Sequence, residues 1–237
     1  MKIGQGYTFS RCFQLLKDKP LRATIGQLGN CFYKPAVFSL SWRNFMVTNV
    51  VLEALKSRRA IRNYEDKSVP ESAIQTILEA AIYAPSAINV QPWKFTIVTN
   101  KAQIKHFSDM AKPVLIRMLP DVGDEGLVGL KKRLSDPNYN IFYNAPLLIF
   151  VSGAKSPYAI YDCSMAAQNM MLAAFTLGIG SCWIGTAVAV ANDPKNKPIL
   201  GVPEDHDVHA AIIFGYPKGG FPKAPEKRPA QILKRID

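Results

Sequence analysis

Residues 84–93 read Ala-Pro-Ser-Ala-Ile-Asn-Val-Gln-Pro-Trp, and this stretch does most to define the fold of the chain. Its first proline ends a helical pattern, and its second delivers the chain into a strand pattern. Those roles leave Ser86, Asn89 and Gln91 unexplained, because they are three hydrogen-bonding side chains in an otherwise apolar turn. Such side chains can satisfy the carbonyl and N–H edge of a flat heterocycle, so the turn is also a candidate binding element.

On both sides of this turn the sequence alternates helical and strand patterns. Ser68 and Glu71 form a capping box that predicts the start of a helix, and an earlier helix has a common face of Val51, Leu52 and Leu55. The further predictions are a strand at 94–99, a helix capped by Asn100, a polar loop at 119–140, a strand at 147–151, a helix at 157–177, and strands at 182–184 and 208–214. Strands separated by helices, without an internal repeat, predict an α/β or α+β sheet protein.

The charge of the chain is unevenly distributed. The 237 residues carry a net charge of +11, and residues 1–45 contribute seven basic residues and one acidic residue without a sustained helical or strand period. We therefore expect a folded domain at 46–237 behind a basic extension at 1–45. This extension is either a targeting or partner-binding arm or a stretch upstream of a natural start at Met46, and it lacks the apolar core of a signal peptide. The rest of the chain shows no basic stripe with interleaved aromatics, so no nucleic-acid partner is expected.

Residues 163–192 contain no charged residue and no histidine. Polar and glycine residues divide this run into a helix and a strand, which is typical of the centre of a soluble core or of a dimer interface. We therefore predict no membrane span, although the run is long enough for one. The four cysteines form no C-x-x-C pair, which favours a reducing, cytoplasmic location. His206 and His209 lie in an acidic stretch and are expected to be solvated loop residues, so no metal site is predicted.

The usual backbone motifs for binding phosphate are absent. There is no P-loop, no nucleophile elbow and no H-E-x-x-H motif, and Gly178 and Gly180 follow a helix without the third glycine of a dinucleotide fingerprint. A phosphate would therefore have to be held by side chains. Arg58, Arg59 and Arg62 are candidates because guanidinium groups bind phosphate oxygens bidentately, and Lys227 with Arg228 forms a second basic pair. The alternative is a solvated basic helix end.

Several motifs together carry a family resemblance. They are Ser-Arg-Arg-Ala-Ile-Arg-Asn-Tyr at 57–64, the Pro-Ser to Gln-Pro-Trp stretch at 85–93, Gln-Asn at 168–169, Gly-Ile-Gly-Ser-Cys-Trp-Ile-Gly at 178–185 and Pro-Glu-Lys-Arg-Pro at 225–229. In this order they resemble the nitroreductase family of FMN-dependent oxidoreductases, from about Val50 to the C-terminus. The resemblance implies an α+β fold with a central, mostly antiparallel sheet flanked by helices. It also implies an interlocked homodimer with FMN in clefts at the subunit interface and the helix at 162–177 in the dimer core.

The resemblance also implies a set of cofactor-binding residues. Arg58, Arg59 and Arg62 would hold the phosphate and ribityl chain with Lys227 and Arg228; Asn89 and Gln91 would contact the ring or ribityl; Pro85 and Ser86 would reach the partner's flavin; Ile184 and Gly185 would pack on the ring; and Asn138 is a weaker match to a ring-contacting position. Two positions depart from the family pattern. Ala60 stands where the family usually has serine, and Glu226 stands where many members have a basic residue.

The activity implied by the resemblance is reduction of nitroaromatics, quinones or related electron-poor acceptors by NAD(P)H. Donor and acceptor would use one site in turn, by ping-pong hydride transfer, and the flavin would carry the hydride with no obligatory catalytic side chain. Two alternatives remain open. One is a specialised flavin reaction, such as reductive dehalogenation or flavin fragmentation, in which the 119–140 segment selects the substrate. The other is a non-catalytic flavin-binding or interaction protein that docks through residues 1–45.

Overall fold

The computed structural model describes residues 50–120 and 125–237. The basic extension expected at 1–45, and the boundary of the domain at 46, lie outside the described residues. The helices and strands, in chain order, are α1 (Val50–Ser57), α2 (Glu71–Ile82), the 3-10 turn η1 (Ala87–Asn89), β1 (Trp93–Val98), α3 (Lys101–Met118), α4 (Glu125–Ser135), β2 (Leu147–Ala154), α5 (Ala159–Thr176), β3 (Gly180–Trp183), α6 (Gly185–Ala191) and β4 (His206–Gly215).

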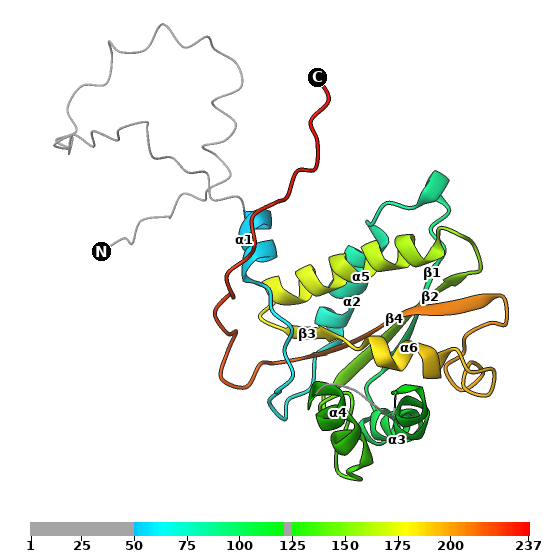
Figure 1. The fold of residues 1–237 in the computed structure, drawn as a ribbon. Coiled ribbons are helices and arrows are strands. Elements are labelled where there is room, and N and C mark those ends of the chain that lie inside the picture. The colour runs from blue at the N-terminus through cyan, green and yellow to red at the C-terminus, as the bar shows by residue number, and fades with distance from the viewer. Residues whose placement is uncertain (1–49, 121–124) are drawn as a thin grey trace, which may run out of the picture. The chain divides into compact units, whose positions relative to one another are not determined.

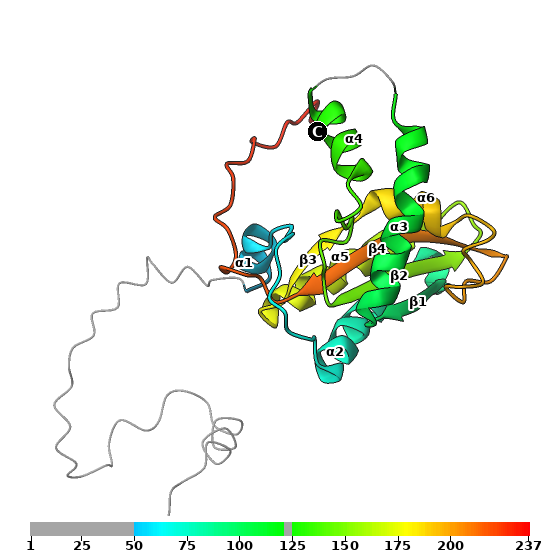
Figure 2. The same ribbon diagram turned by 90° about the horizontal axis from the view of Figure 1, so that it is seen from below.

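The four strands form one sheet in the order β1-β2-β4-β3, and every pair is antiparallel. The expected α+β class with an antiparallel sheet is therefore confirmed. Side chains alternate across the buried central strands β2 and β4, so the sheet has two apolar faces. On one face Ile149 and Ile212 pack with α2 and α5, and on the other Phe150 and Ile213 pack with α3, α4 and α6. Figures 1 and 2 show these helices on the two sides of the sheet.

Two sequence predictions about helix ends have different outcomes. Asn100 caps α3 as predicted, because its side-chain oxygen accepts hydrogen bonds from the backbone N–H groups of Ala102 and Gln103. The prediction of a capping box at Ser68 and Glu71 was wrong. Helix α2 begins at Glu71 with Pro70 as its N-cap residue, and no side chain caps it, so Ser68 lies too far before the first turn.

Three further expectations need correction. Much of the predicted loop at 119–140 is the helix α4, and α6 was not predicted. The expected common face of α1 is exposed at Val51, Leu52 and Leu55, so α1 presents apolar surface outward. His206 and His209 are not solvated loop residues, because both lie on β4, where His206 has 6% of its surface exposed and His209 is half-buried.

Candidate functional site

The arginine segment at 58–62 is joined to strand β3 through backbone contacts. The Ile61 N–H donates to the Ser181 carbonyl at 3.0 Å, and Ala60 forms a bridge with Ser181. This close approach requires Gly180, because a Cβ atom there would lie 2.6 Å from Ile61 Cγ1. The segment therefore has a fixed register against β3.

The side chains of the three arginines at 58, 59 and 62 have different surroundings. Burial raises the pKa of the Cys182 thiol, while the charges of Arg62 and Arg58 lower it, so both guanidinium groups act on the same residue of β3. Arg59 is used differently. One of its terminal nitrogens donates to the carbonyl oxygens of Lys56 at 2.6 Å and Arg58 at 2.5 Å, which satisfies acceptors at the end of α1. The structure thus brings Arg58 and Arg62 toward Cys182 and turns Arg59 back to the helix.

Two polar atoms at this junction have unmet hydrogen-bonding capacity. Arg59 Nε and Ser181 Oγ are buried, and neither has a hydrogen-bond partner among the described residues. Buried donors of this kind are normally paired with protein or ligand acceptors. A phosphate group, which offers several acceptor oxygens, is chemically suited to such a place beside an arginine segment.

A cavity of about 530 Å³ opens next to Arg62. One wall contains Arg62 and the residues Trp183, Ile184 and Gly185, where β3 passes into α6. A cavity of this size is within the range of small-molecule and cofactor sites. The other lining residues come from α3, α4, the turn that follows α4, and α6. The structure therefore brings three of the predicted residues, Arg62, Ile184 and Gly185, to one cavity.

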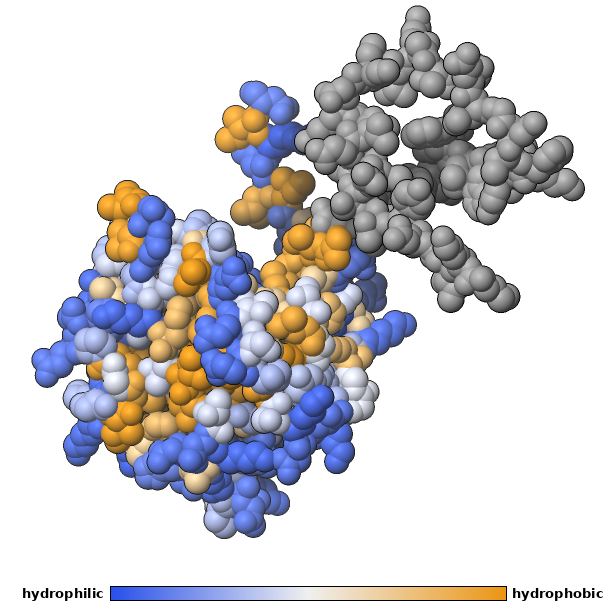
Figure 3. All heavy atoms as spheres, turned by 180° about the vertical axis from the view of Figure 1, so that it is seen from behind, coloured by the Kyte–Doolittle hydropathy of each residue, from blue (hydrophilic) through white to orange (hydrophobic). Residues whose placement is uncertain are grey.

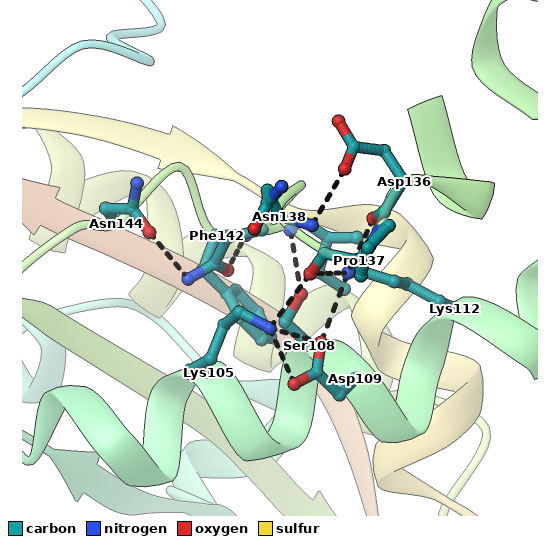
Figure 4. Close-up of polar contacts among 11 residues, drawn as sticks. Lys105, Ser108, Asp109, Lys112, Asp136, Pro137, Asn138, Phe142 and Asn144 are labelled. Carbon is teal, nitrogen blue, oxygen red and sulfur yellow. Dashed lines mark hydrogen bonds and ion pairs between the residues drawn. The ribbon is translucent and has the colours of Figure 1, made fainter. Parts of the chain in front are cut away.

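The turn after α4 is anchored on α3, as Figure 4 shows. The buried Lys112 donates through Nζ to the carbonyl oxygens of Asp136 at 3.0 Å and Pro137 at 3.1 Å, and Ser108 Oγ accepts from the Ile141 N–H at 3.0 Å. Asn138 lies on this anchored turn with an exposed side chain, and its N–H donates to Asp136 Oδ1 at 2.8 Å.

Two tyrosines on the same turn line the cavity and were not predicted. The Tyr143 ring lies 5.9 Å from the guanidinium carbon of Arg62, which is within cation–π range, and its hydroxyl lies 3.4 Å from that of Tyr139. Tyr143 has a φ of 53°, a left-handed conformation that is unusual for an aromatic residue. Burial is the main cause that raises the pKa of Tyr139 to about 12, so this phenol stays neutral near pH 7. A sequence pattern gives no sign of such a turn.

The loop at 85–91 lies at a different place. The Ala87 N–H donates to Asp162 Oδ1 at 3.1 Å, in the first turn of α5, and Ser86 Oγ accepts from the Gln91 N–H at 2.9 Å. Gln91 Nε2 also donates to Asn89 Oδ1 at 3.0 Å. Ile88, Asn89 and Gln91 have positive φ values, so the loop has a strained conformation of the kind often found at binding sites.

The loop and the arginine segment lie at opposite ends of α5. The loop contacts Asp162 near its start, whereas the arginine segment pairs with Ser181, shortly after its end. The helix length between Asp162 and Thr176 is about 21 Å at the usual rise per residue. Within one chain, the loop is therefore separated from Arg58 and Arg62. The predicted residues on this loop are Pro85, Ser86, Asn89 and Gln91.

Lys227 and Arg228 are exposed on the C-terminal tail, whose residues 221–237 form no helix or strand. The tail leads away from the sheet in Figures 1 and 2. Its start is held by Phe221, which packs edge-on against Phe175 of α5 with 4.8 Å between ring centroids. The structure does not bring this basic pair to the cavity.

No group of three or more metal-ligating side chains is found within residues 50–120 and 125–237. No helix in the described part of the chain is long and apolar enough to cross a membrane.

Comparison with known proteins identifies the family. The family model described as "Nitroreductase family" matches residues 55–216. A putative NADH dehydrogenase/NAD(P)H nitroreductase of Archaeoglobus fulgidus is 33% identical over 167 residues, covering 70% of this chain and 85% of that protein. The crystal structure of a nitroreductase with bound FMN from Bacteroides fragilis is 34% identical with a TM-score of 0.68, covering 80% of this chain and all of that one. Rat iodotyrosine deiodinase 1 is 25% identical over 198 residues, covering 78% of this chain and 68% of that protein. The chain belongs to the nitroreductase family.

Proposed function

We propose that this protein is an FMN-dependent oxidoreductase that uses NAD(P)H to reduce nitroaromatics, quinones or related electron-poor acceptors. The observation that carries the proposal is the convergence of Arg62, Ile184 and Gly185 on one cavity, in a chain whose relatives include an FMN-bound nitroreductase. A location in the cytoplasm is part of the proposal and rests on the two free, buried cysteines at 163 and 182.

The residues around the cavity suit the parts of FMN. Arg58 would bind the phosphate, together with the unpaired Nε of Arg59. Lys227 and Arg228 would contribute only if the exposed tail reaches the phosphate, since the structure does not bring them to the cavity. Arg62 would place positive charge beside the ring, and Ile184 and Gly185 would supply a flat apolar contact. Asn138 is exposed on the turn after α4 and does not line the cavity, so it would have to reach the ring from there. The serine usual in the family is absent at Ala60, and the buried hydroxyl of Ser181, the bridge partner of Ala60, is the nearest replacement in the fold.

The division of the site along α5 supports a homodimer. Because the loop at 85–91 and the arginine segment of one chain are about a helix length apart, the loop of a second copy would complete the site. Apolar side chains are exposed on α1 at Val50 and Val51 and on α5 at Ile160 and Tyr161, which is typical of surface that pairs with another chain. Figure 3 shows hydrophobic surface among hydrophilic residues on one face of the molecule.

Bound FMN supplies hydride acceptance from NAD(P)H and hydride donation to the acceptor. The protein's part is to position and stabilise. Arg62, held over the Tyr143 ring, would favour negative charge on a reduced cofactor, since a fixed cation stabilises charge that develops beside it. No side chain in the cavity is required as a proton donor, because water can serve.

The test is the visible spectrum of the purified full-length protein, followed by NAD(P)H oxidation with a panel of acceptors. We expect flavin absorbance, release of FMN on denaturation, and turnover with nitroaromatics or quinones. A colourless protein that shows no spectral change when FMN is added would contradict the proposal.

A second candidate function is reductive dehalogenation, which the similarity to rat iodotyrosine deiodinase 1 favours. Release of halide from a halogenated phenol, without turnover of nitroaromatics, would support it. A non-catalytic role through residues 1–45 predicts that deleting those residues abolishes function, whereas the enzyme should keep its flavin and turnover.

A further inference from the structure

The apolar side chains of the loop at 85–91 are not covered by the rest of the chain. Ile88 and Val90 are 96% and 57% exposed, so apolar packing does not hold the loop in place. Ile88, Asn89 and Gln91 have positive φ values, and residues with side chains keep such a conformation only where the surrounding contacts enforce it. The conformation of the loop therefore depends on its hydrogen bonds.

The internal hydrogen bonds of the loop join its two amide side chains. Gln91 Nε2 donates to Asn89 Oδ1 at 3.0 Å, and the Gln91 N–H donates to Ser86 Oγ at 2.9 Å. In the turn η1, the Asn89 N–H donates to the Ser86 carbonyl at 3.0 Å. The amides of Asn89 and Gln91 are thus linked as one unit, and the position of this unit depends on where the loop is attached.

The attachment is made by the carboxylate of Asp162. The first N–H group of a helical turn has no acceptor within that turn, and the N-cap residue of η1, Ser86, makes no capping hydrogen bond through its side chain. Asp162 Oδ1 accepts the first N–H of η1, that of Ala87, at 3.1 Å from 75 positions away in the sequence. Asp162 therefore caps η1 from a different element of the fold.

The surroundings of Asp162 favour a carboxylate in this place. Asp162 is 3% exposed and lies in the first turn of α5, where the unpaired N–H groups of the helix give a partial positive charge. A buried charge is costly unless it is hydrogen-bonded, and here the hydrogen bond goes to the loop. The burial of this carboxylate therefore depends on the loop, just as the loop depends on the carboxylate.

A second side chain of α5 makes a comparable attachment to another segment. Asn169 follows Asp162 by seven residues, which is about two helical turns, so both side chains lie on the same face of α5. Asn169 Nδ2 donates to the Ala80 carbonyl at 3.1 Å, and Ala80 belongs to α2. Asn169 thus fastens α2 to α5, whereas Asp162 fastens the loop.

We propose that Asp162 is a positioning residue for FMN, because its carboxylate holds the loop in the conformation that presents Asn89 and Gln91 to the cofactor. The inference rests on the proposed function, in which this loop contacts FMN. Without the hydrogen bond from Ala87 to Asp162, the loop is free to leave its strained conformation. Binding of FMN must then supply the free energy that restores it, so the affinity falls.

The decisive variant is Asp162→Ala, which removes the acceptor. We expect the Kd for FMN, measured by fluorescence titration of the full-length apoprotein, to rise about tenfold, as for the loss of one hydrogen bond to a charged group. Asp162→Asn should keep the Kd close to that of the wild type, because an amide oxygen also accepts the Ala87 N–H. Asn169→Ala is the matched control. It should lower the melting temperature, because α2 loses a hydrogen bond to α5, and leave the Kd for FMN unchanged.

Two further variants distinguish positioning of the loop from a general loss of structure. Adding Asp162→Ala to a chain that already has alanine in place of Asn89 and Gln91 should not weaken FMN binding further, because no amide side chains remain to be positioned. Ala87→Pro removes the N–H donor without changing the core. Ser86 has a ψ of 154°, which suits a residue before proline, and proline is tolerated at the first position of a helical turn. This variant should weaken FMN binding about as much as Asp162→Ala, and it decides the question if Asp162→Ala does not fold.

The proposal is overturned if Asp162→Ala and Ala87→Pro both bind FMN as tightly as the wild type. It is also overturned if Asn169→Ala or Asp162→Asn weakens binding as much as Asp162→Ala, because the effect would then follow stability or charge rather than the hydrogen bond. Further weakening by Asp162→Ala in the absence of the two amides would show that Asp162 does not act through the loop. A wild-type protein that does not bind FMN would instead refute the proposed function.

Discussion

The two ends of helix α5 carry different halves of the candidate site. At its C-terminal end the arginine segment is held by backbone pairing to β3 and by the absence of a side chain at Gly180. At its N-terminal end the loop at 85–91 is held by one contact to Asp162 and by hydrogen bonds among its own residues. The first half is part of the sheet, and the second is a strained loop fastened to a helix.

If both halves bind one cofactor, their separation implies that a single chain does not make a complete site. Helix α5 packs one face against the sheet and keeps positions 162 and 176 about 21 Å apart, so neither half can move to the other. In that case the arginine segment of one chain must meet the loop at 85–91 of a second chain. A twofold-symmetric dimer, in which each chain contributes its loop to the site of the other, achieves this.

The largest predicted effect tests whether each FMN site is shared between two chains. Two variants are made separately: one replaces Arg58 and Arg62 with alanine, and the other replaces Asn89 and Gln91 with alanine. Each variant should bind FMN about a hundredfold more weakly, because charge-assisted or multiple hydrogen bonds are lost. A hybrid of the two mutant chains should recover one intact site in each dimer. Hybrids isolated with two different affinity tags should therefore hold about half of the wild-type FMN per chain, given twofold symmetry.

The control for this experiment is a dimer that carries both double replacements in both chains, which should remain colourless. Two colourless single-mutant proteins that yield a colourless hybrid would show that each site lies within one chain. Full FMN content in the Asn89 and Gln91 variant would show that the loop does not contact the cofactor at all.

A smaller effect is expected at the arginine end alone. In Gly180→Ala the new methyl group would lie 2.6 Å from Ile61 Cγ1, so the arginine segment must move away from β3. We expect about tenfold weaker FMN binding and a loss of about 1–3 kcal/mol in the free energy of unfolding, as for other overpacked sites. Fluorescence titration with FMN and urea denaturation measure these two quantities.

Gly129→Ala in α4 is the matched control, because nothing lies within 4 Å of its added methyl group. This change should leave FMN binding unchanged and add a few tenths of a kcal/mol of stability, as alanine favours a helix. The double variant Ile61→Ala with Gly180→Ala should recover FMN binding. If Gly180→Ala binds FMN as well as the wild type, the register of the arginine segment does not matter for the site.

The sequence predicted much of the fold and part of the site. Asn100 could be assigned as a cap because its effect is local, and Arg62 and Ile184 could be placed together because the family motifs carry that information. Helix α4 was missed because Gly126 and Gly129 and few apolar residues weaken its helical pattern. Tyr143 was missed because its position depends on a left-handed turn anchored by Lys112, which lies 31 positions away. Arg59 turns to the α1 carbonyls, and no local pattern distinguishes it from Arg58.

The smallest predicted effect lies at the loop end and depends on pH. His209 on β4 is half-buried near Cys163 of α5, and its Nε2 is buried without a hydrogen-bond partner among the described residues. Burial lowers the pKa of His209, and the charge of Asp207 offsets this only in part. The unfolded chain therefore binds a proton near pH 6.5 that the folded chain binds only at lower pH, so stability should fall as the pH drops below about 6.5.

The size of this effect should remain below that of one full proton, about 1.4 kcal/mol per pH unit, because His209 is only partly buried. Melting temperatures measured between pH 7.5 and 5 should decline less steeply in His209→Gln than in the wild type. His106→Gln, at an exposed position on α3, should keep the wild-type slope. The Lys197 ammonium lowers the pKa of Asp207, so this carboxylate takes up its proton only at more acidic pH. Its titration therefore does not contribute to the slope between pH 7.5 and 5. If His209→Gln has the same slope as the wild type, the loop end does not set the acid sensitivity of the fold.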